Sequence, residues 1–271
     1  MSSELKTKFE NLKEIFQTMG KVLVAFSGGV DSTFLLKVAQ DTLGKEHVVA
    51  VTALSPLYPE RELKSVKKLV QTLGVRHRLI ESNELEIPGF SKNPPNRCYY
   101  CKRKLFLELW SLAKEEALPF IVEGSTLDDQ KDHRPGKMAI QELGIRSPLE
   151  EAGLTKIEVR ELSKAMGLPT WDKPSFACLA SRFPYGEEIT EKSLRMVDEA
   201  EDFLFGLGFK QVRVRHYGNL ARIEILKEEM EHLMNGSLRE KVVSHLKNIG
   251  YQYITLDLQG FRSGSMNEVL G

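Results

Sequence analysis

The feature that most constrains this chain is a short glycine loop between an apolar segment and a helical segment near its amino terminus. Residues 21–26 have the apolar pattern of a buried strand, and residues 33–39 have that of a helix. The loop between them reads Ser27-Gly28-Gly29-Val30-Asp31-Ser32. Its glycines let backbone N–H groups approach an anion, and the serine hydroxyls and the helix N-terminus add donors and positive partial charge. This order predicts a phosphate-binding loop; the alternative is a βα turn without a ligand.

The SGG-x-DS loop resembles the pyrophosphate loop of the ATP-pyrophosphatase, or PP-loop, superfamily. Members of that superfamily cleave ATP between its α- and β-phosphates and adenylate an oxygen of their substrate. The resemblance implies that Ser27, Gly28, Gly29, Asp31 and Ser32 bind the nucleotide, and that Asp31 is also catalytic.

Strands and helices alternate through the first part of the chain. We expect strands at 22–26, 48–53, 77–81 and 120–123, and helices at 3–19, from the loop to about 43, 59–73 and 101–116. This alternation predicts an α/β fold with a parallel sheet, in which ligands bind beyond the carboxyl ends of the strands. Phe26 and Glu123 both end strands, so the Ser27 loop and the segment 124–132 should face one pocket. Gly124 is therefore a further candidate to bind the nucleotide.

The pattern changes after about Pro174. We expect a helix at 190–207 with Thr190 as its N-cap, strands at 211–216 and 221–225, a helix at 227–249 broken near 235–236, and a closing strand at 251–258. This is a smaller α+β domain with an antiparallel sheet, followed by a loose tail after Gly260. The predicted domains are a PP-loop ATP pyrophosphatase domain at 1–182 and a smaller substrate or oligomerisation domain at 183–271.

Overall charge and hydropathy exclude several classes of partner. The chain has 38 Lys and Arg residues against 38 Asp and Glu residues, so no bulk positive charge indicates a nucleic acid. No apolar run approaches the length of a membrane span, and the first residues lack a signal-peptide core. We therefore expect a cytoplasmic protein with no membrane partner, in which cysteines serve as metal ligands or reactive thiols.

The chain has three cysteines, two of them in a C-x-x-C pair. Cys98 and Cys101 can bind one metal centre from a single turn, and Cys178 supplies a third thiolate. A zinc site would need a fourth ligand, such as His133 or His216. A [4Fe–4S] cluster held by three cysteines would instead leave one iron open. The alternative for the pair is two ordinary half-buried thiols.

Cys178 also has a possible role of its own. It lies between Lys173 and Arg182, whose positive charges favour a thiolate nucleophile and hence a sulfur donor or carrier. The alternative is a cysteine that only packs.

The segment 123–136 is rich in acidic residues. Asp128 and Asp129 follow a strand end opposite the phosphate loop, where carboxylate oxygens can hold Mg²⁺. Arg134 in the same segment can clamp a phosphate or a carboxylate. A solvated acidic turn is the alternative.

Two arginines on one predicted strand form the last candidate site. Alternation places Arg213 and Arg215 on one face, where they repel each other unless an anion lies between them. The anion is either a bound phosphate or a carboxylate of the chain such as Glu224.

Together these motifs resemble those of the LarE family, the ATP-dependent sulfur transferases of nickel-pincer nucleotide cofactor assembly. The resemblance runs from about residue 21 to residue 258 and includes the segments SGGVDS, RCYYCK, GSTLDDQKDHRPG, PTWDKPSFACLASRFPYG and RVRH. It implies a homo-oligomer that uses ATP and Mg²⁺ to convert a carboxylate of pyridinium-3,5-biscarboxylic acid mononucleotide to a thiocarboxylate. The resemblance makes Ser181, Arg182, Arg213 and Arg215 candidates to hold the substrate phosphate.

The family has two sulfur sources. One type sacrifices the sulfur of the single cysteine in the ACLASR segment, and the other holds a [4Fe–4S] cluster on three cysteines that passes on an extra sulfide. Cys98, Cys101 and Cys178 match the cluster type, with sacrificial use of Cys178 as the alternative. Outside this family, the chain could be a PP-loop tRNA thiolase, an ammonia-using synthetase or a non-catalytic nucleotide- or zinc-binding module.

Overall fold

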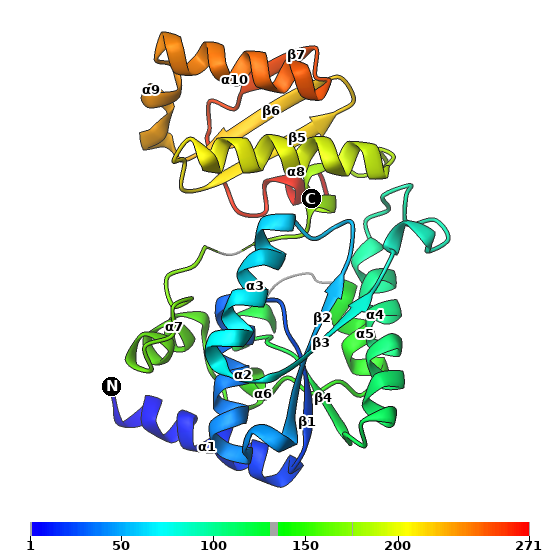
Figure 1. Cartoon of the computed structure of the whole chain (residues 1–271), viewed down its shortest axis with the longest axis vertical. Helices are drawn as coiled ribbons and strands as arrows, with labels where there is room; N and C mark the ends of the chain where they lie inside the picture. The colour runs from blue at the N-terminus through cyan, green and yellow to red at the C-terminus, as the bar shows by residue number, and fades with distance from the viewer. Residues whose placement is uncertain (1, 131–134, 175, 271) are drawn as a thin grey trace. The chain divides into compact units, whose positions relative to one another are not determined.

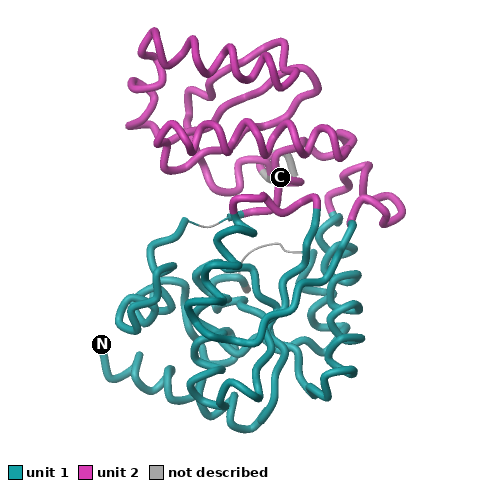
Figure 2. Tube along the Cα trace, in the orientation of Figure 1, with its two compact units in different colours: residues 1–55, 62–83, 96–176 teal, residues 56–61, 84–95, 177–271 magenta. Residues whose placement is uncertain are grey.

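The computed structural model describes residues 2–130, 135–174 and 176–270, and the chain divides into two compact units. Unit 1 comprises residues 1–55, 62–83 and 96–176, and unit 2 comprises residues 56–61, 84–95 and 177–271 (Figure 2). These units differ from the division predicted at residue 182, because two short segments of the first half and residues 177–182 belong to unit 2.

Unit 1 is built on a four-stranded parallel sheet (Figure 1). Its strands are β1 (Val22–Ala25), β2 (Val48–Leu54), β3 (Arg76–Glu81) and β4 (Phe120–Val122), in the order β3-β2-β1-β4. The chain moves outward from β1 to β3 and then returns to the other side of β1. The order therefore reverses between β1 and β4, which is where open α/β sheets bind their ligands. The predicted parallel α/β sheet is confirmed.

Helices cover both faces of this sheet. They are α1 (Ser3–Met19), α2 (Val30–Leu43), α3 (Glu60–Leu73), α4 (Arg97–Glu115), α5 (Pro135–Glu142), α6 (Pro148–Glu151) and α7 (Lys156–Ala165). Helices α4 and α5 pack against one face, where Phe106 and Leu109 join Leu23 and Ile121 in an apolar cluster. Helices α1 and α2 lie on the other side of the sheet (Figure 1).

The predicted helix at 101–116 begins too late. Helix α4 starts at Arg97, so both cysteines of the C-x-x-C pair lie within its first two turns. Helices α5 to α7 were not predicted, although α7 has a clear start signal. Thr155 accepts the backbone N–H of Glu158, and the Glu158 carboxylate accepts that of Thr155 in return.

The described residues of unit 2 combine three strands with three α-helices. These are α8 (Glu191–Gly206), β5 (Val212–Tyr217), β6 (Leu220–Ile225), α9 (Met230–Leu233), α10 (Gly236–Ile249) and β7 (Tyr253–Leu256). Thr190 caps α8, and the helical segment breaks before Gly236, both as predicted. Strands β5 and β6 are antiparallel, but β6 and β7 are parallel. The prediction of an antiparallel sheet is therefore wrong for β7, because α10 lies between β6 and β7 as a crossover.

The two faces of the unit 2 sheet differ in chemistry. One face carries apolar residues such as Val214 and Ile223, which form a core with residues of α8 and α10. The other carries Arg213, Arg215 and their cross-strand neighbours. The tail is tied to this face, because Phe261 packs under the Arg213 guanidinium and the Ser265 hydroxyl accepts from Arg215. The expectation of a loose tail is wrong for this part of it. No helix in the described part of the chain is long and apolar enough to cross a membrane.

Candidate active site

The glycine loop of unit 1 forms an open cradle of donors between β1 and α2. The N–H groups of residues 29–32 meet no acceptor within the described ranges. Because the first N–H groups of a helix have no intrahelical partner, they are available to an anion. The Ser27 and Ser32 hydroxyls lie 3.1 Å apart at the same loop. Gly28 has φ +66, and a Cβ there would lie 2.5 Å from a Val66 methyl carbon, so glycine is required.

The end of β4 lies directly beside this loop. A Cβ added at Gly124 would be 3.1 Å from the Ser32 backbone nitrogen and 3.4 Å from the Asp31 Cβ. The residue after β4 thus packs on the first turn of α2 with no room for a side chain. This contact places the glycine loop and Gly124 at the same edge of the sheet.

Asp31 projects from the first turn of α2 and interacts with Lys156. The Lys156 Nζ is 3.0 Å from Asp31 Oδ2, whereas Asp31 Oδ1 is buried and has no hydrogen-bond partner in the described ranges. Burial raises the pKa of Asp31, and Lys156 opposes this rise. Nothing in the sequence indicated Lys156, because it stands 125 positions from Asp31 along the chain and is brought close only by the fold.

The two acidic residues predicted for Mg²⁺ lie near Lys156 but already accept hydrogen bonds. Asp128 Oδ2 accepts a hydrogen bond from the backbone N–H of Lys156, at 2.6 Å, at the start of α7. Asp129 Oδ2 accepts the N–H and the hydroxyl of Thr126 at 2.8 and 3.2 Å. Asp129 nevertheless contributes to the rise in the pKa of Asp31 by charge repulsion. The fold therefore brings Asp31, Asp128 and Asp129 to one region around Lys156.

The C-x-x-C pair lies at the start of α4 in the same unit. Cys98 is exposed and Cys101 is half-buried. Next to the pair, Lys102 reaches from α4 to Glu123 at the end of β4, with 3.8 Å between Nζ and Oε2. Since Glu123 directly precedes Gly124, the first turns of α4 lie on the same side of the sheet edge as the glycine loop.

No three or more His, Cys, Asp or Glu side chains in the described ranges form a group that could hold a metal ion. His133, proposed as a zinc ligand, and Arg134, proposed as an anion clamp, lie outside the described residues. The other proposed zinc ligand, His216, lies in unit 2, where its Nδ1 is 3.1 Å from the Tyr251 hydroxyl. Burial lowers the pKa of His216.

In unit 2, Cys178 is an exposed free thiol immediately before a short 3-10 turn, Leu179–Arg182. Arg182 is buried and pairs with the fully buried Glu201 through two hydrogen bonds of 2.7 and 2.9 Å. A third nitrogen of Arg182 donates to the Ser181 hydroxyl at 2.8 Å. The turn after Cys178 is therefore held in place by a buried ion pair.

Arg213 and Arg215 have different partners. Arg215 is buried and donates to both oxygens of Glu224, at 2.9 and 2.8 Å, and to the Ser181 carbonyl at 2.7 Å. Arg213 is only 8% exposed, and its guanidinium has no hydrogen bond or carboxylate partner in the described part of unit 2. Burial, with repulsion from Arg182 and Arg215, lowers its pKa to about 10. Of these two arginines, Arg213 is thus the one whose guanidinium has no direct carboxylate partner among the described residues.

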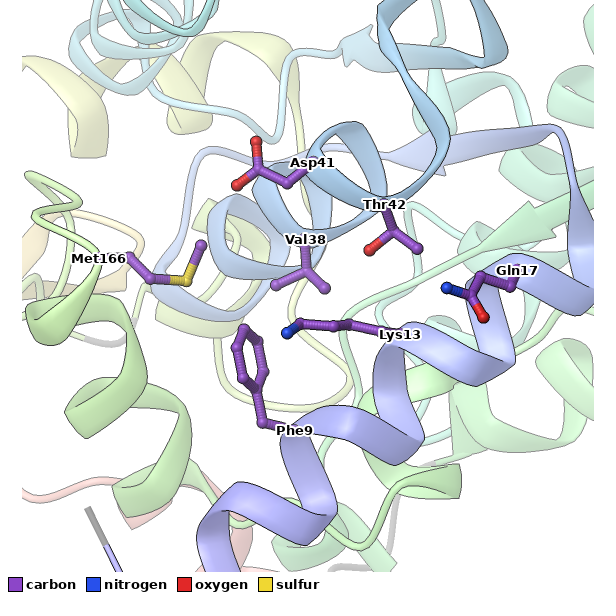
Figure 3. A pocket seen from close by; sticks show the side chains of 7 residues that line it. All are labelled: Phe9, Lys13, Gln17, Val38, Asp41, Thr42 and Met166. Carbon is purple, nitrogen blue, oxygen red and sulfur yellow. The ribbon is translucent and has the colours of Figure 1, made fainter.

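A hollow of about 480 Å³ elsewhere in unit 1 contains none of these residues (Figure 3). It is lined by Phe9, Lys13, Gln17, Val38, Asp41, Thr42 and Met166. Asp41 is at the opposite end of α2 from Asp31, about 15 Å away along the helix axis. The candidate site is therefore the open edge of the sheet and not this hollow.

The chain is similar in sequence to several known proteins. The NAD synthase family matches residues 5–88, which include the glycine loop. The pyridinium-3,5-bisthiocarboxylic acid mononucleotide synthase of Lactiplantibacillus plantarum is 37% identical over 98% of this chain and 96% of its own length. The uncharacterized protein slr1717 of Synechocystis sp. is 45% identical over 98% of this chain and 99% of its own. The uncharacterized protein MJ0830 of Methanocaldococcus jannaschii is 30% identical over 93% of this chain and 95% of its own length.

These similarities extend over nearly the whole chain and are not confined to the glycine loop. The chain therefore belongs to the LarE family, that of pyridinium-3,5-bisthiocarboxylic acid mononucleotide synthase.

Proposed function

We propose that this protein is an ATP-dependent sulfurtransferase. It adenylates a carboxylate of pyridinium-3,5-biscarboxylic acid mononucleotide and converts it to a thiocarboxylate for the nickel-pincer cofactor. The observation that carries the proposal is the cradle of free N–H groups beside Asp31, in a chain that aligns end to end with a named synthase of the bisthiocarboxylic acid. The proposed enzyme acts in the cytoplasm as a homo-oligomer.

In the proposed reaction, the loop N–H groups bind the β- and γ-phosphates of ATP. A carboxylate oxygen of the substrate attacks the α-phosphorus, and the bond to the β-phosphate oxygen breaks to release pyrophosphate. A sulfide then attacks the carbonyl carbon of the acyl-adenylate, and AMP leaves with the former carboxylate oxygen. The loop and Lys156 contribute by positioning the phosphates and balancing their negative charge.

Asp31 fits a role in binding Mg²⁺. Its Oδ1 is a buried oxygen with no donor among the described residues, and a carboxylate oxygen in this state suits a hard cation. Asp128 and Asp129 are further candidate ligands. Bound Mg²⁺ would neutralise charge on the departing pyrophosphate.

The three cysteines fit an iron–sulfur cluster by their donor chemistry. Cys98, Cys101 and Cys178 each carry a thiol, and thiolates hold such clusters. We propose that the three residues hold a [4Fe–4S] cluster, which when bound would supply an open iron position for sulfide. The alternative is that Cys178 donates its own sulfur.

Arg213 is the proposed contact for the substrate phosphate. Its guanidinium is held in place over the Phe261 ring, 4.5 Å from the centroid, with no carboxylate partner described. Ser181, Arg182 and Arg215 would support it, since their hydrogen bonds link the turn after Cys178 to the strand that carries Arg213. Arg213→Met should raise the KM for the mononucleotide and leave the KM for ATP unchanged.

The test of adenylation is AMP and pyrophosphate formation by wild-type protein and by Asp31→Ala. We expect Asp31→Ala to abolish both products. Asp41→Ala is the matched control, because it removes an exposed carboxylate at the far end of the same helix. Normal AMP formation by Asp31→Ala would contradict the proposed phosphate site, and turnover that requires tRNA and not the mononucleotide would favour a tRNA thiolase.

The sulfur source is tested separately, by purification without oxygen. We expect about four irons per chain with matching acid-labile sulfide, both lost when Cys98, Cys101 or Cys178 is replaced by serine. Absence of iron after reconstitution would contradict the cluster. A loss of mass equal to H₂S after turnover would then identify Cys178 as the donor.

A further inference from the structure

Lys173 reaches the phosphate loop from a distant segment of unit 1. Its Nζ donates to the Gly28 carbonyl oxygen at 3.1 Å and to Glu62 Oε2 of α3 at 2.6 Å. Its side chain is 20% exposed and that of Glu62 is 14% exposed, so the contact is largely sheltered from water. The reaction steps proposed above give Lys173 no role.

The backbone that carries Lys173 is itself held firmly. The Lys173 N–H donates to the Thr170 carbonyl at 3.0 Å, and its own carbonyl accepts from Arg160 at 2.7 Å. Arg160 also donates to the Trp171 carbonyl at 2.8 Å. The ammonium group is therefore aimed at the loop from a fixed base, which lowers the entropy cost of holding a long side chain there.

The Gly28 carbonyl belongs to the same peptide unit as the Gly29 N–H. In a planar trans peptide these two groups point in opposite directions, and unit 1 contains no cis peptide among its described residues. A carbonyl that faces Lys173 therefore turns the Gly29 N–H away from Lys173, and this N–H has no acceptor among the described residues. A glycine on each side makes rotation of this peptide sterically cheap, since neither residue has a Cβ.

Rotation of the Gly28–Gly29 peptide would point a carbonyl where the Gly29 N–H points now. The loop would then lose a donor and present an acceptor that repels phosphate. We propose that Lys173 is a positioning residue that locks this peptide in the orientation that binds the pyrophosphate part of ATP, with Glu62 aiming its ammonium group. This inference rests on the proposed function, because it assumes that the loop binds the β- and γ-phosphates.

The experiment is calorimetric titration of the full chain with magnesium pyrophosphate and, separately, with AMP. A charge-assisted hydrogen bond contributes enough that Lys173→Met should raise the Kd for pyrophosphate about tenfold. AMP lacks the phosphates that the loop holds, so its Kd should not change. Lys173→Arg keeps a cationic donor and should stay within about threefold of wild type.

Lys8→Met is the matched control. It removes a lysine from an ion pair of the same unit with nearly the same length and exposure, 2.7 Å to Glu158 with 22% of the lysine side chain exposed. Its Kd for pyrophosphate should equal that of wild type. A general loss of stability in Lys173→Met would instead weaken both ligands and would not be rescued by arginine.

Equal pyrophosphate binding by wild type and Lys173→Met would overturn the inference. Failure of the wild-type chain to bind pyrophosphate would be a different result, because it would contradict the proposed function itself. If Lys173→Met does not fold, Glu62→Gln provides the second test. It should raise the Kd for pyrophosphate about threefold, and an unchanged Kd would overturn the proposal.

Discussion

Replacement of Arg215 by methionine should destabilise unit 2 strongly. Arg215 and Glu224 are each 1% exposed, and their side chains share two hydrogen bonds of 2.9 and 2.8 Å. Arg215→Met leaves the Glu224 carboxylate buried, with Arg222 at 3.1 Å as its remaining ion-pair partner among the described residues. A buried ion that loses its partner costs about 3–5 kcal/mol. The remaining contact with Arg222 places this case near 3 kcal/mol.

The double variant Arg215→Met/Glu224→Leu distinguishes a lost ion pair from lost packing. It removes both charges together, so most of the cost should be recovered. Arg195→Met is the control for an arginine of the same unit, because its pair with Glu191 is exposed, with side-chain exposures of 69% and 63%. An exposed pair of this kind contributes less than about 1 kcal/mol.

The assay is native-state hydrogen exchange of the β5 and β6 amides, which reports the opening of unit 2 by itself. For Arg215→Met, about 3 kcal/mol corresponds to roughly a hundredfold faster exchange by opening. Arg195→Met should change exchange less than about fivefold. Wild-type protection in Arg215→Met, or equal losses in the single and double variants, would refute the argument from a buried carboxylate.

Three further outcomes follow from the site and its surroundings. Gly28→Ala should weaken pyrophosphate binding at least about tenfold, because its Cβ would lie 2.5 Å from a valine of α3. Gly20→Ala is the control, since Gly20 has a similar φ of +70 but open space around it, and its pyrophosphate affinity should not change. Calorimetry compares the two variants, and equal affinities would argue against a close-packed loop. Lys156→Ala should move the acid limb of the pH profile of AMP formation to higher pH, because Lys156 lowers the pKa of Asp31. An unchanged pH profile would show that Lys156 does not control the titration of Asp31 during the reaction. Burial lowers the pKa of His216, so the unfolded chain binds the proton more readily, and the stability of the fold decreases as the pH drops through 6.5. His216→Phe should therefore lose less stability than wild type between about pH 8 and pH 5, and equal losses would contradict this.

The phosphate loop could be predicted from the sequence because its parts are contiguous. A strand, a glycine turn and a helix start follow one another within residues 22–43, so local pattern alone places Ser27 to Ser32 at a helix N-terminus. Gly124 could also be predicted to lie at this loop, because the carboxyl ends of parallel strands meet at one edge of the sheet. Lys156 and Lys173 could not, because each reaches the loop from a segment over a hundred residues away whose path depends on the tertiary fold.

The arginine strand shows the same limit. Alternation correctly places Arg213 and Arg215 on one face of β5, and Glu224 was a candidate partner. Sequence does not decide which arginine Glu224 pairs with. Glu224 is opposite Arg213 in the strand register but hydrogen-bonds diagonally with Arg215, since side-chain geometry as well as register determines the contact. The parallel pairing of β7 was missed for a related reason, because a strand pattern does not reveal strand direction.

The proposed sulfur transfer can be tested by the products of one incubation of the protein with ATP, Mg²⁺ and pyridinium-3,5-biscarboxylic acid mononucleotide. AMP, pyrophosphate and the mass of the mononucleotide are measured together. Sulfur transfer by adenylation predicts equal amounts of AMP and pyrophosphate, and a mononucleotide heavier by the mass difference between sulfur and oxygen for each AMP formed. Release of ADP, or AMP formation with no sulfur in the mononucleotide from protein loaded with sulfide, would contradict it.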